Sequence, residues 1–70
     1  MSKSTHCFYT RRIRDDLFII ERDDGSYLAF EQKIVYDPTL AIPFSCVSAA
    51  YDFGSVFFKN NPHMGEFYKL

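Results

Sequence analysis

The sequence predicts a small α+β domain, in which one helix packs across one face of an antiparallel sheet of three to four strands. One observation is an Asp-Gly turn between two runs of β-branched and aromatic residues; the other is a later segment with apolar residues at helical spacing. A helix on one face of a sheet is a two-layer arrangement. We expect a single domain, 1–70, because a chain of 70 residues is too short for two.

The composition indicates a folded chain with a small core. Hydrophobic residues make up 47% of the sequence and aromatic residues 19%, and the formal net charge is −1. Disordered chains are poor in aromatic residues and rich in net charge, so disorder is not expected. A domain of this size buries only about 60% of the surface that its unfolded chain exposes. Natural domains this small commonly add disulfides, a metal or an oligomeric partner.

The N-terminal sequence favours a cytoplasmic protein. The start, MSKSTHCFYT, lacks the apolar run of a secretory signal, and no stretch reaches the length of a membrane span. A disulfide between Cys7 and Cys46 would need the secretory route, so both thiols are expected to be reduced. We expect no contact with a membrane.

The stretch "LFIIERDDGSYLAF" predicts a β-hairpin, because Asp-Gly between such runs is a strong turn signal. A two-residue loop would place Glu21 on the apolar face. A three-residue loop over 23–25, with Gly25 left-handed, keeps that face apolar, and a slip of one residue would exchange the faces. We therefore predict the three-residue loop. Its cross-strand pairs would be Ile20 with Leu28 and Phe18 with Phe30.

The segments on either side of the hairpin predict further elements. Upstream, "HCFYTRRIR" predicts a strand that leads into the hairpin through a turn at Asp15-Asp16. Downstream, "QKIVY" either extends the second hairpin strand or forms another strand after a bend. The two prolines of "DPTLAIPF" predict a loop. The tail, "HMGEFYKL", is predicted to be a short edge strand with Phe67 turned inward.

The stretch "CVSAAYDFGSVFFKNNP" predicts a helix with Ser45 as N-cap and a stop at Asn60-Asn61-Pro62. Gly54 costs about 1 kcal/mol against alanine inside a helix, so the sequence allows a kink there. The polar stripe consists of Ser45, Ser48, Asp52, Ser55 and Lys59. The predicted core face consists of Cys46, Ala49, Ala50, Phe53 and Phe57. Three large apolar residues fall outside that face, namely Val47, Tyr51 and Phe58.

Residue types that bind metals or catalyse reactions are present without the spacing that either role requires. The residues of zinc-ligand type are His6, Cys7, Cys46 and His63. Structural zinc sites usually contain close pairs of ligands, which these residues do not form, so no metal is expected. Cys7 and His6 are neighbours on a predicted strand and point to opposite faces, which separates a thiol from its base. We therefore expect that the protein is not an enzyme and that it binds no cofactor and no small-molecule substrate.

The basic strand allows nucleic-acid binding as the second hypothesis. Its arginines are Arg11, Arg12 and Arg14; the last two are predicted to share a strand face with Phe8, and Arg11 is predicted to lie with Tyr9. Arginines beside aromatic residues suit phosphate contact and base stacking. The same charges would also protect an edge strand from aggregation. The acidic hairpin next to them can neutralise them within the chain.

The leading hypothesis is a non-catalytic protein–protein interaction module. Residues 38–62 contain only two charged residues, and the cores of protein interfaces are poor in charge and rich in aromatic residues. The predicted contact residues are Val47, Tyr51 and Phe58, with Arg11, Arg12 and Arg14 as a second surface. The three apolar side chains would be covered by another protein, by a second copy in a homo-oligomer such as a dimer, or by the chain's own "TLAIPF".

A class-level analogy extends this hypothesis. Short chains that are neither basic nor catalytic are common among phage-encoded inhibitors of host proteins. By that analogy we expect an inhibitor or regulator that docks on a host protein.

Overall fold

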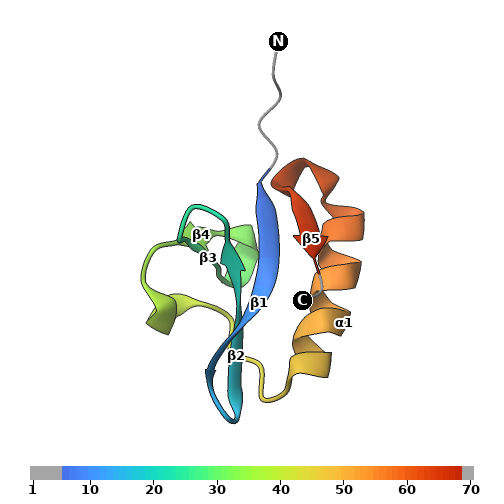
Figure 1. The fold of residues 1–70 in the computed structure, drawn as a ribbon. Coiled ribbons are helices and arrows are strands. Elements are labelled where there is room, and N and C mark those ends of the chain that lie inside the picture. Colours follow the sequence, from blue (N-terminus) through green and yellow to red (C-terminus); the bar gives the residue numbers. More distant parts are fainter. Residues whose placement is uncertain (1–5, 69–70) are drawn as a thin grey trace.

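One α-helix packs against a five-stranded sheet in the computed structural model, which describes residues 6–68 (Figure 1). The strands are β1 (Cys7–Arg14), β2 (Leu17–Arg22), β3 (Tyr27–Leu28), β4 (Ile34–Val35) and β5 (Glu66–Tyr68), and the helix is α1 (Val47–Asn60). Three 3-10 helices connect them: η1 (Phe30–Gln32), η2 (Pro38–Leu40) and η3 (Pro62–Met64). The predicted α+β class is confirmed. The sheet has five strands within residues 6–68, rather than the predicted three to four.

The sheet is mixed because its last strand runs parallel to its first. The strand order is β4-β3-β2-β1-β5, and all neighbours are antiparallel except β1 and β5. A parallel pair needs a long crossover connection, and the segment from β2 to β5 that contains α1 supplies it. The prediction of an edge strand at the tail is confirmed. The prediction of a wholly antiparallel sheet fails at this strand.

The hairpin between β2 and β3 has the predicted three-residue loop. The amide of Arg22 donates to the carbonyl of Ser26 at 2.7 Å, and the amide of Gly25 donates to the carbonyl of Arg22 at 3.0 Å. Gly25 has φ +90°, in the left-handed region that glycine adopts without a steric penalty. In this register Ile20 and Leu28 lie on the helix side of the sheet, where each is 1% exposed or less.

The predicted pair of Phe18 with Phe30 is wrong. β3 ends at Leu28, and the chain then turns away through Glu31 and Gln32, which have φ values of 62° and 61°. Phe30 is left 61% exposed. Phe18 instead exchanges backbone hydrogen bonds of 2.7 and 2.8 Å with Phe44, so a later segment of chain takes the place beside β2 that β3 vacates.

Asp24 organises the hairpin loop. Its carboxylate accepts hydrogen bonds from the Arg22 guanidinium at 2.7 and 3.0 Å, from the amide of Ser26 at 3.0 Å and from the hydroxyl of Tyr36 at 3.3 Å. The Ser26 hydroxyl donates to it as well. The hydrogen bonds from Arg22, followed by those from Ser26, lower the pKa of Asp24 well below its ordinary value of 3.8.

We expect the Asp24→Asn variant to be less stable than the wild type near pH 7, with a difference that narrows in acid. A carboxylate whose pKa is lowered by folding stabilises the native state above its unfolded pKa. That contribution is lost as the pH falls below about 4 towards the folded-state value. Urea denaturation at neutral and acidic pH measures it. Parallel stability profiles for the two proteins would show that the loop does not depend on this charge.

The core lies between the sheet and α1. Its buried members are Phe8, Ile20, Leu28 and Phe58. The ring of Phe58 lies 4.5 Å from that of Phe8, centroid to centroid. Ala50 and Gly54, two turns and one turn before Phe58 on the helix, are buried on the same side. The helix face that meets the sheet is therefore formed by Ala50, Gly54 and Phe58. The predicted face was centred on Phe53 and Phe57, which are only half-buried. The helix N-cap is Cys46, not the predicted Ser45.

Gly54 allows the tail strand to pack directly on the helix. The ring of Phe67, in the middle of β5, lies so close that a Cβ atom built on Gly54 would be 2.5 Å from its Cζ. The same ring is stacked on Phe58, with an interplanar angle of 4° and centroids 5.7 Å apart. The predicted inward direction of Phe67 is confirmed. α1 runs through Gly54 as one helix from Val47 to Asn60.

Candidate functional site

The three apolar residues predicted to form a contact surface lie in three different environments. Phe58 is 6% exposed and belongs to the core, so the prediction that it lies outside the core-facing side is wrong. Tyr51 is half-buried, with its ring 6.4 Å from that of Phe67. Only Val47 is exposed, at 36%. Phe67 of β5 packs beside Tyr51 and fills the space above Gly54. Ile42 and Phe44 of the "TLAIPF" segment pack against the core cluster that contains Phe58.

The three predicted arginines of β1 each contact an acidic side chain of β2 or of the turn between β1 and β2. Nη1 of Arg11 donates to both carboxylate oxygens of Glu21, at 3.0 and 3.3 Å, and this hydrogen bonding raises the pKa of Arg11. The two other ion pairs are Arg12 with Asp15 at 3.6 Å and Arg14 with Asp16 at 3.4 Å. Exposed pairs of this kind contribute little to stability and exchange partners readily. The pair of Arg11 with buried Glu21 is the fixed one.

A bulge in β1 divides the arginines between the two faces of the sheet. Arg12 lies opposite Phe18 and Arg14 lies opposite Leu17, so Ile13 is the extra residue in the ladder. Phe18 and Leu17 are successive residues on β2 and point to opposite faces. The prediction that Arg14 shares a face with Phe8 and Arg12 is therefore wrong, because the bulge moves Arg14 to the face that carries Arg11.

The sheet face opposite α1, called here the open face, carries a row of tyrosines. Directly paired residues on neighbouring strands share a face, and the pairing aligns one residue from each strand. From β5 to β4 the aligned residues are Tyr68, Tyr9, Glu21, Tyr27 and Val35. Tyr9, Tyr27 and Tyr68 form the tyrosine row. Its exposed end is Tyr68, at 46%, while the other two tyrosines are half-buried.

The hydroxyls of Tyr9 and Tyr68 are held neutral. The hydroxyl of Tyr68 donates to Oε1 of Glu66 at 2.7 Å, and this hydrogen bond raises the pKa of Tyr68 to about 12. Burial, together with the charge of Glu21, raises the pKa of Tyr9. The row therefore presents aromatic rings and neutral hydroxyl groups, with carboxylates at Glu21 and Glu66 beside them.

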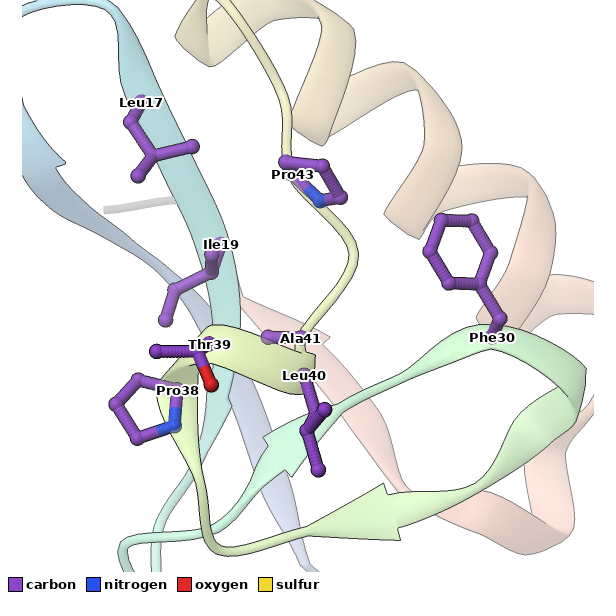
Figure 2. A pocket seen from close by; sticks show the side chains of 8 residues that line it. All are labelled: Leu17, Ile19, Phe30, Pro38, Thr39, Leu40, Ala41 and Pro43. Atoms are coloured by element: carbon purple, nitrogen blue, oxygen red, sulfur yellow. The ribbon is translucent and has the colours of Figure 1, made fainter.

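Next to the tyrosine row, the open face contains an apolar hollow of about 380 Å³. Leu17 and Ile19 of β2 form its floor, and Pro38, Thr39 and Leu40 of η2 form the opposite wall (Figure 2). Ala41, Pro43 and Phe30 complete the lining, with Phe30 at the end away from Leu17. Ile19 is 2% exposed, whereas Leu40 is 57% exposed and stands at the rim. Such a lining suits an apolar side chain and offers no charged group.

The hollow exists because the chain after η2 joins the sheet beside β2. Ala41 lies opposite Ala29, the amide of Ile42 donates to the carbonyl of Leu28 at 3.1 Å, and Phe44 pairs with Phe18. Asp37 caps η2 by accepting the amide of Thr39 at 3.0 Å, and hydrogen bonds from the hydroxyl and then the amide of Thr39 lower the pKa of Asp37. These bonds fix the wall of the hollow against β2, on the side of the sheet away from α1.

The residues of metal-ligand type do not come together. Within residues 6–68, no three His, Cys, Asp or Glu side chains are placed to hold a metal ion, and both cysteines are free. Nδ1 of His6 lies 3.2 Å from Oδ1 of Asp23, at the start of β1. Cys46 lies at the N-terminus of α1, where the hydroxyl of Ser48 and then the amide of Ala49 lower the pKa of its thiol.

One feature of the sequence indicates that the open face is a contact surface. Leu17 and Ile19 alternate with Phe18 and Ile20, so β2 is apolar on both faces, and strands of that kind are covered on both sides. The tyrosine row had no such signal, because its members come from three separate strands whose register only the structure defines.

In comparisons with known proteins, the chain matches no family model, no curated protein and no solved structure. No helix in the described part of the chain combines the length and apolar character that a bilayer crossing requires.

Proposed function

We propose that this protein is a non-catalytic protein-binding domain that docks through its open face. The observation that carries the proposal is the apolar hollow floored by Leu17 and Ile19, beside a row of three tyrosines, on a sheet face without a complete covering layer in residues 6–68. An uncovered face of an antiparallel sheet is ordinarily polar. Tyrosine and arginine are among the residues that most often dominate binding energy at protein interfaces.

The charges on the open face favour a protein over a nucleic acid as partner. Glu21 and Glu66 lie in or next to the tyrosine row, and Arg11 already contacts Glu21. Phosphate binding depends on uncompensated positive charge, and a net charge of −1 supplies none for the whole chain. The tyrosine row suits base stacking, so oligonucleotide binding is the alternative that the test includes.

Occupying the surface of another protein is how a small inhibitor or regulator acts. The phage-type inhibitor suggested by class-level analogy is a role of this kind. We propose that the protein acts in the cytoplasm, where Cys7 and Cys46 stay reduced.

We expect a pull-down with the wild type to capture a defined protein that the Leu40→Asp variant loses. Leu40 is 57% exposed at the rim of the hollow, so a charge there disturbs docking without entering the core. Val56→Asp is the matched control, because Val56 is 60% exposed on α1 and the charge change is the same. The captured protein is identified by mass spectrometry, and its binding is then repeated with purified components.

Equal loss of capture in the Leu40→Asp and Val56→Asp variants would contradict docking through the open face. Fluorescent single- and double-stranded oligonucleotides are titrated in parallel at low and moderate salt. Salt-dependent binding that disappears in an Arg11→Ala/Arg14→Ala variant would replace the proposal with nucleic-acid recognition.

A further inference from the structure

We infer that the partner of the open face is a second copy of the same chain, turned end for end. The inference rests on the proposed function, since it names the protein that this face binds. It follows from the arrangement of the face itself, which carries two unlike halves that complement each other.

The two halves lie at opposite ends of the strands. At one end, where β1 begins, the tyrosine row lies beside the carboxylates of Glu21 and Glu66. At the other end, where β1 finishes, the hollow over Leu17 and Ile19 lies beside Arg14, which forms an exposed ion pair with Asp16. Because Arg11 and Glu21 already pair with each other between the two ends, one half is aromatic and carries Glu66, and the other is hollowed and carries Arg14.

A two-fold axis that crosses the strands within the interface brings these unlike halves together. With such an axis, a residue near one end of the strands in one copy faces a residue near the other end in its mate, on the strand at the same place in the sheet. Every contact between the two copies then occurs twice. The tyrosine row of each copy meets the hollow of the other. Tyr27 on β3 is well placed for this, because the segment 41–44 that borders the hollow occupies the position beside β2 that β3 leaves. The Glu66 end of one copy meets the Arg14 end of its mate.

Three further properties agree with a second copy. The net charge of −1 gives little repulsion between identical chains. A standard interface takes about 800 Å² from each partner, about a sixth of the 4738 Å² that the chain exposes. Arg14 contacts Asp16 only as an exposed pair at 3.4 Å, so its charge can turn to another carboxylate.

The first experiment is sedimentation equilibrium of the full chain from micromolar to millimolar concentration. We expect a reversible monomer–dimer equilibrium in the wild type and in Val56→Asp. We expect Leu40→Asp to weaken dimerisation about tenfold or more, the effect of spoiling one well-packed contact residue. Thermal melting of each variant establishes that it is folded. A wild type that stays monomeric throughout, or equal weakening by both substitutions, would overturn the inference.

The second experiment tests the end-for-end arrangement by exchanging charges. Arg14→Glu alone and Glu66→Lys alone are each expected to weaken dimerisation. An equimolar mixture of the two variants should restore it, because the mixed dimer contains one reversed pair and one native pair. A mixture no stronger than either variant alone would overturn the antiparallel arrangement.

The results separate this inference from the proposed function. A monomeric protein whose purified, identified partner binds the wild type but not Leu40→Asp would overturn the dimer and leave docking through the open face in place. A monomer that binds neither protein nor oligonucleotide through this face would overturn both.

Discussion

The Gly54→Ala variant is expected to lose about 1–3 kcal/mol of unfolding free energy, the range for overpacking a filled core. From helix propensity alone the same change should gain about 1 kcal/mol. The sign reverses because the new methyl group would lie 2.5 Å from Cζ of Phe67 and at a similar distance from the neighbouring ring carbons. The ring has little room to move, since it is stacked on Phe58 and meets Tyr51 edge-on.

A double-mutant cycle with Phe67→Ala isolates this contact. In the Phe67→Ala background the methyl group added at position 54 no longer meets the ring of Phe67, so Gly54→Ala should be neutral or stabilise by up to about 1 kcal/mol. Ser55→Ala, at the exposed neighbouring position, reports helix propensity alone. Urea denaturation of the variants gives the free energies. Equal destabilisation by Gly54→Ala in both backgrounds would show that Phe67 is not the cause.

The Phe58→Asp variant is expected to be unfolded at room temperature. Truncating a buried phenylalanine costs about 3–5 kcal/mol, and an unpaired buried carboxylate adds to that cost. Domains have about 5–15 kcal/mol of stability in total, and a 70-residue chain belongs at the low end of that range. Phe58 is 6% exposed and contacts the rings of Phe8, Phe57 and Phe67, so no surface position is open to the new charge.

Circular dichroism and the dispersion of the amide proton spectrum measure this loss of folding. Val47→Asp is the matched control, because Val47 is 36% exposed on the same helix and should tolerate the charge. A folded Phe58→Asp protein would mean that this ring lies outside the core. The result also decides how binding is probed: loss of a partner by Phe58→Asp would report unfolding, whereas Leu40→Asp changes the surface only.

The hairpin was predictable because its determinants are local. The Asp-Gly turn and the alternation of apolar residues fix both the loop length and the register, as the bond between Arg22 and Ser26 confirms. The prediction failed just beyond Leu28. Nothing in the sequence around Phe30 indicates that Glu31 and Gln32 adopt positive φ and turn the chain out of the sheet.

The side of α1 that faces the sheet could not be predicted from the residues of the helix alone. Ala49, Phe53 and Phe57 form as regular an apolar stripe as Ala50, Gly54 and Phe58. The choice between them depends on Phe67, which lies on a different strand and needs the space that a glycine leaves. For that reason two of the three predicted contact residues, Tyr51 and Phe58, lie against or within the core rather than on a free surface.

The sequence predicted that the protein has an apolar and aromatic contact surface, but not where on the fold that surface lies. A surplus of apolar and aromatic residues indicated a contact surface, and exposed Phe30 and Leu40 agree with a surplus. Its location on the open face depends on long-range pairing. The bulge at Ile13 places Arg14 there, and the bond between Ile42 and Leu28 places the wall of the hollow there.

The parallel pairing of β5 with β1 has a mechanical consequence. The first and last strands lie side by side and point the same way, so the chain enters β1 at one end of the sheet and leaves β5 towards the other (Figure 1). Tension applied between the start of β1 and the end of β5 would slide these strands past each other instead of peeling them apart. The backbone hydrogen bonds between β1 and β5 would then resist the force together rather than break one after another. The ring of Phe67, which packs between Gly54 and Phe58 of α1, would also oppose the sliding.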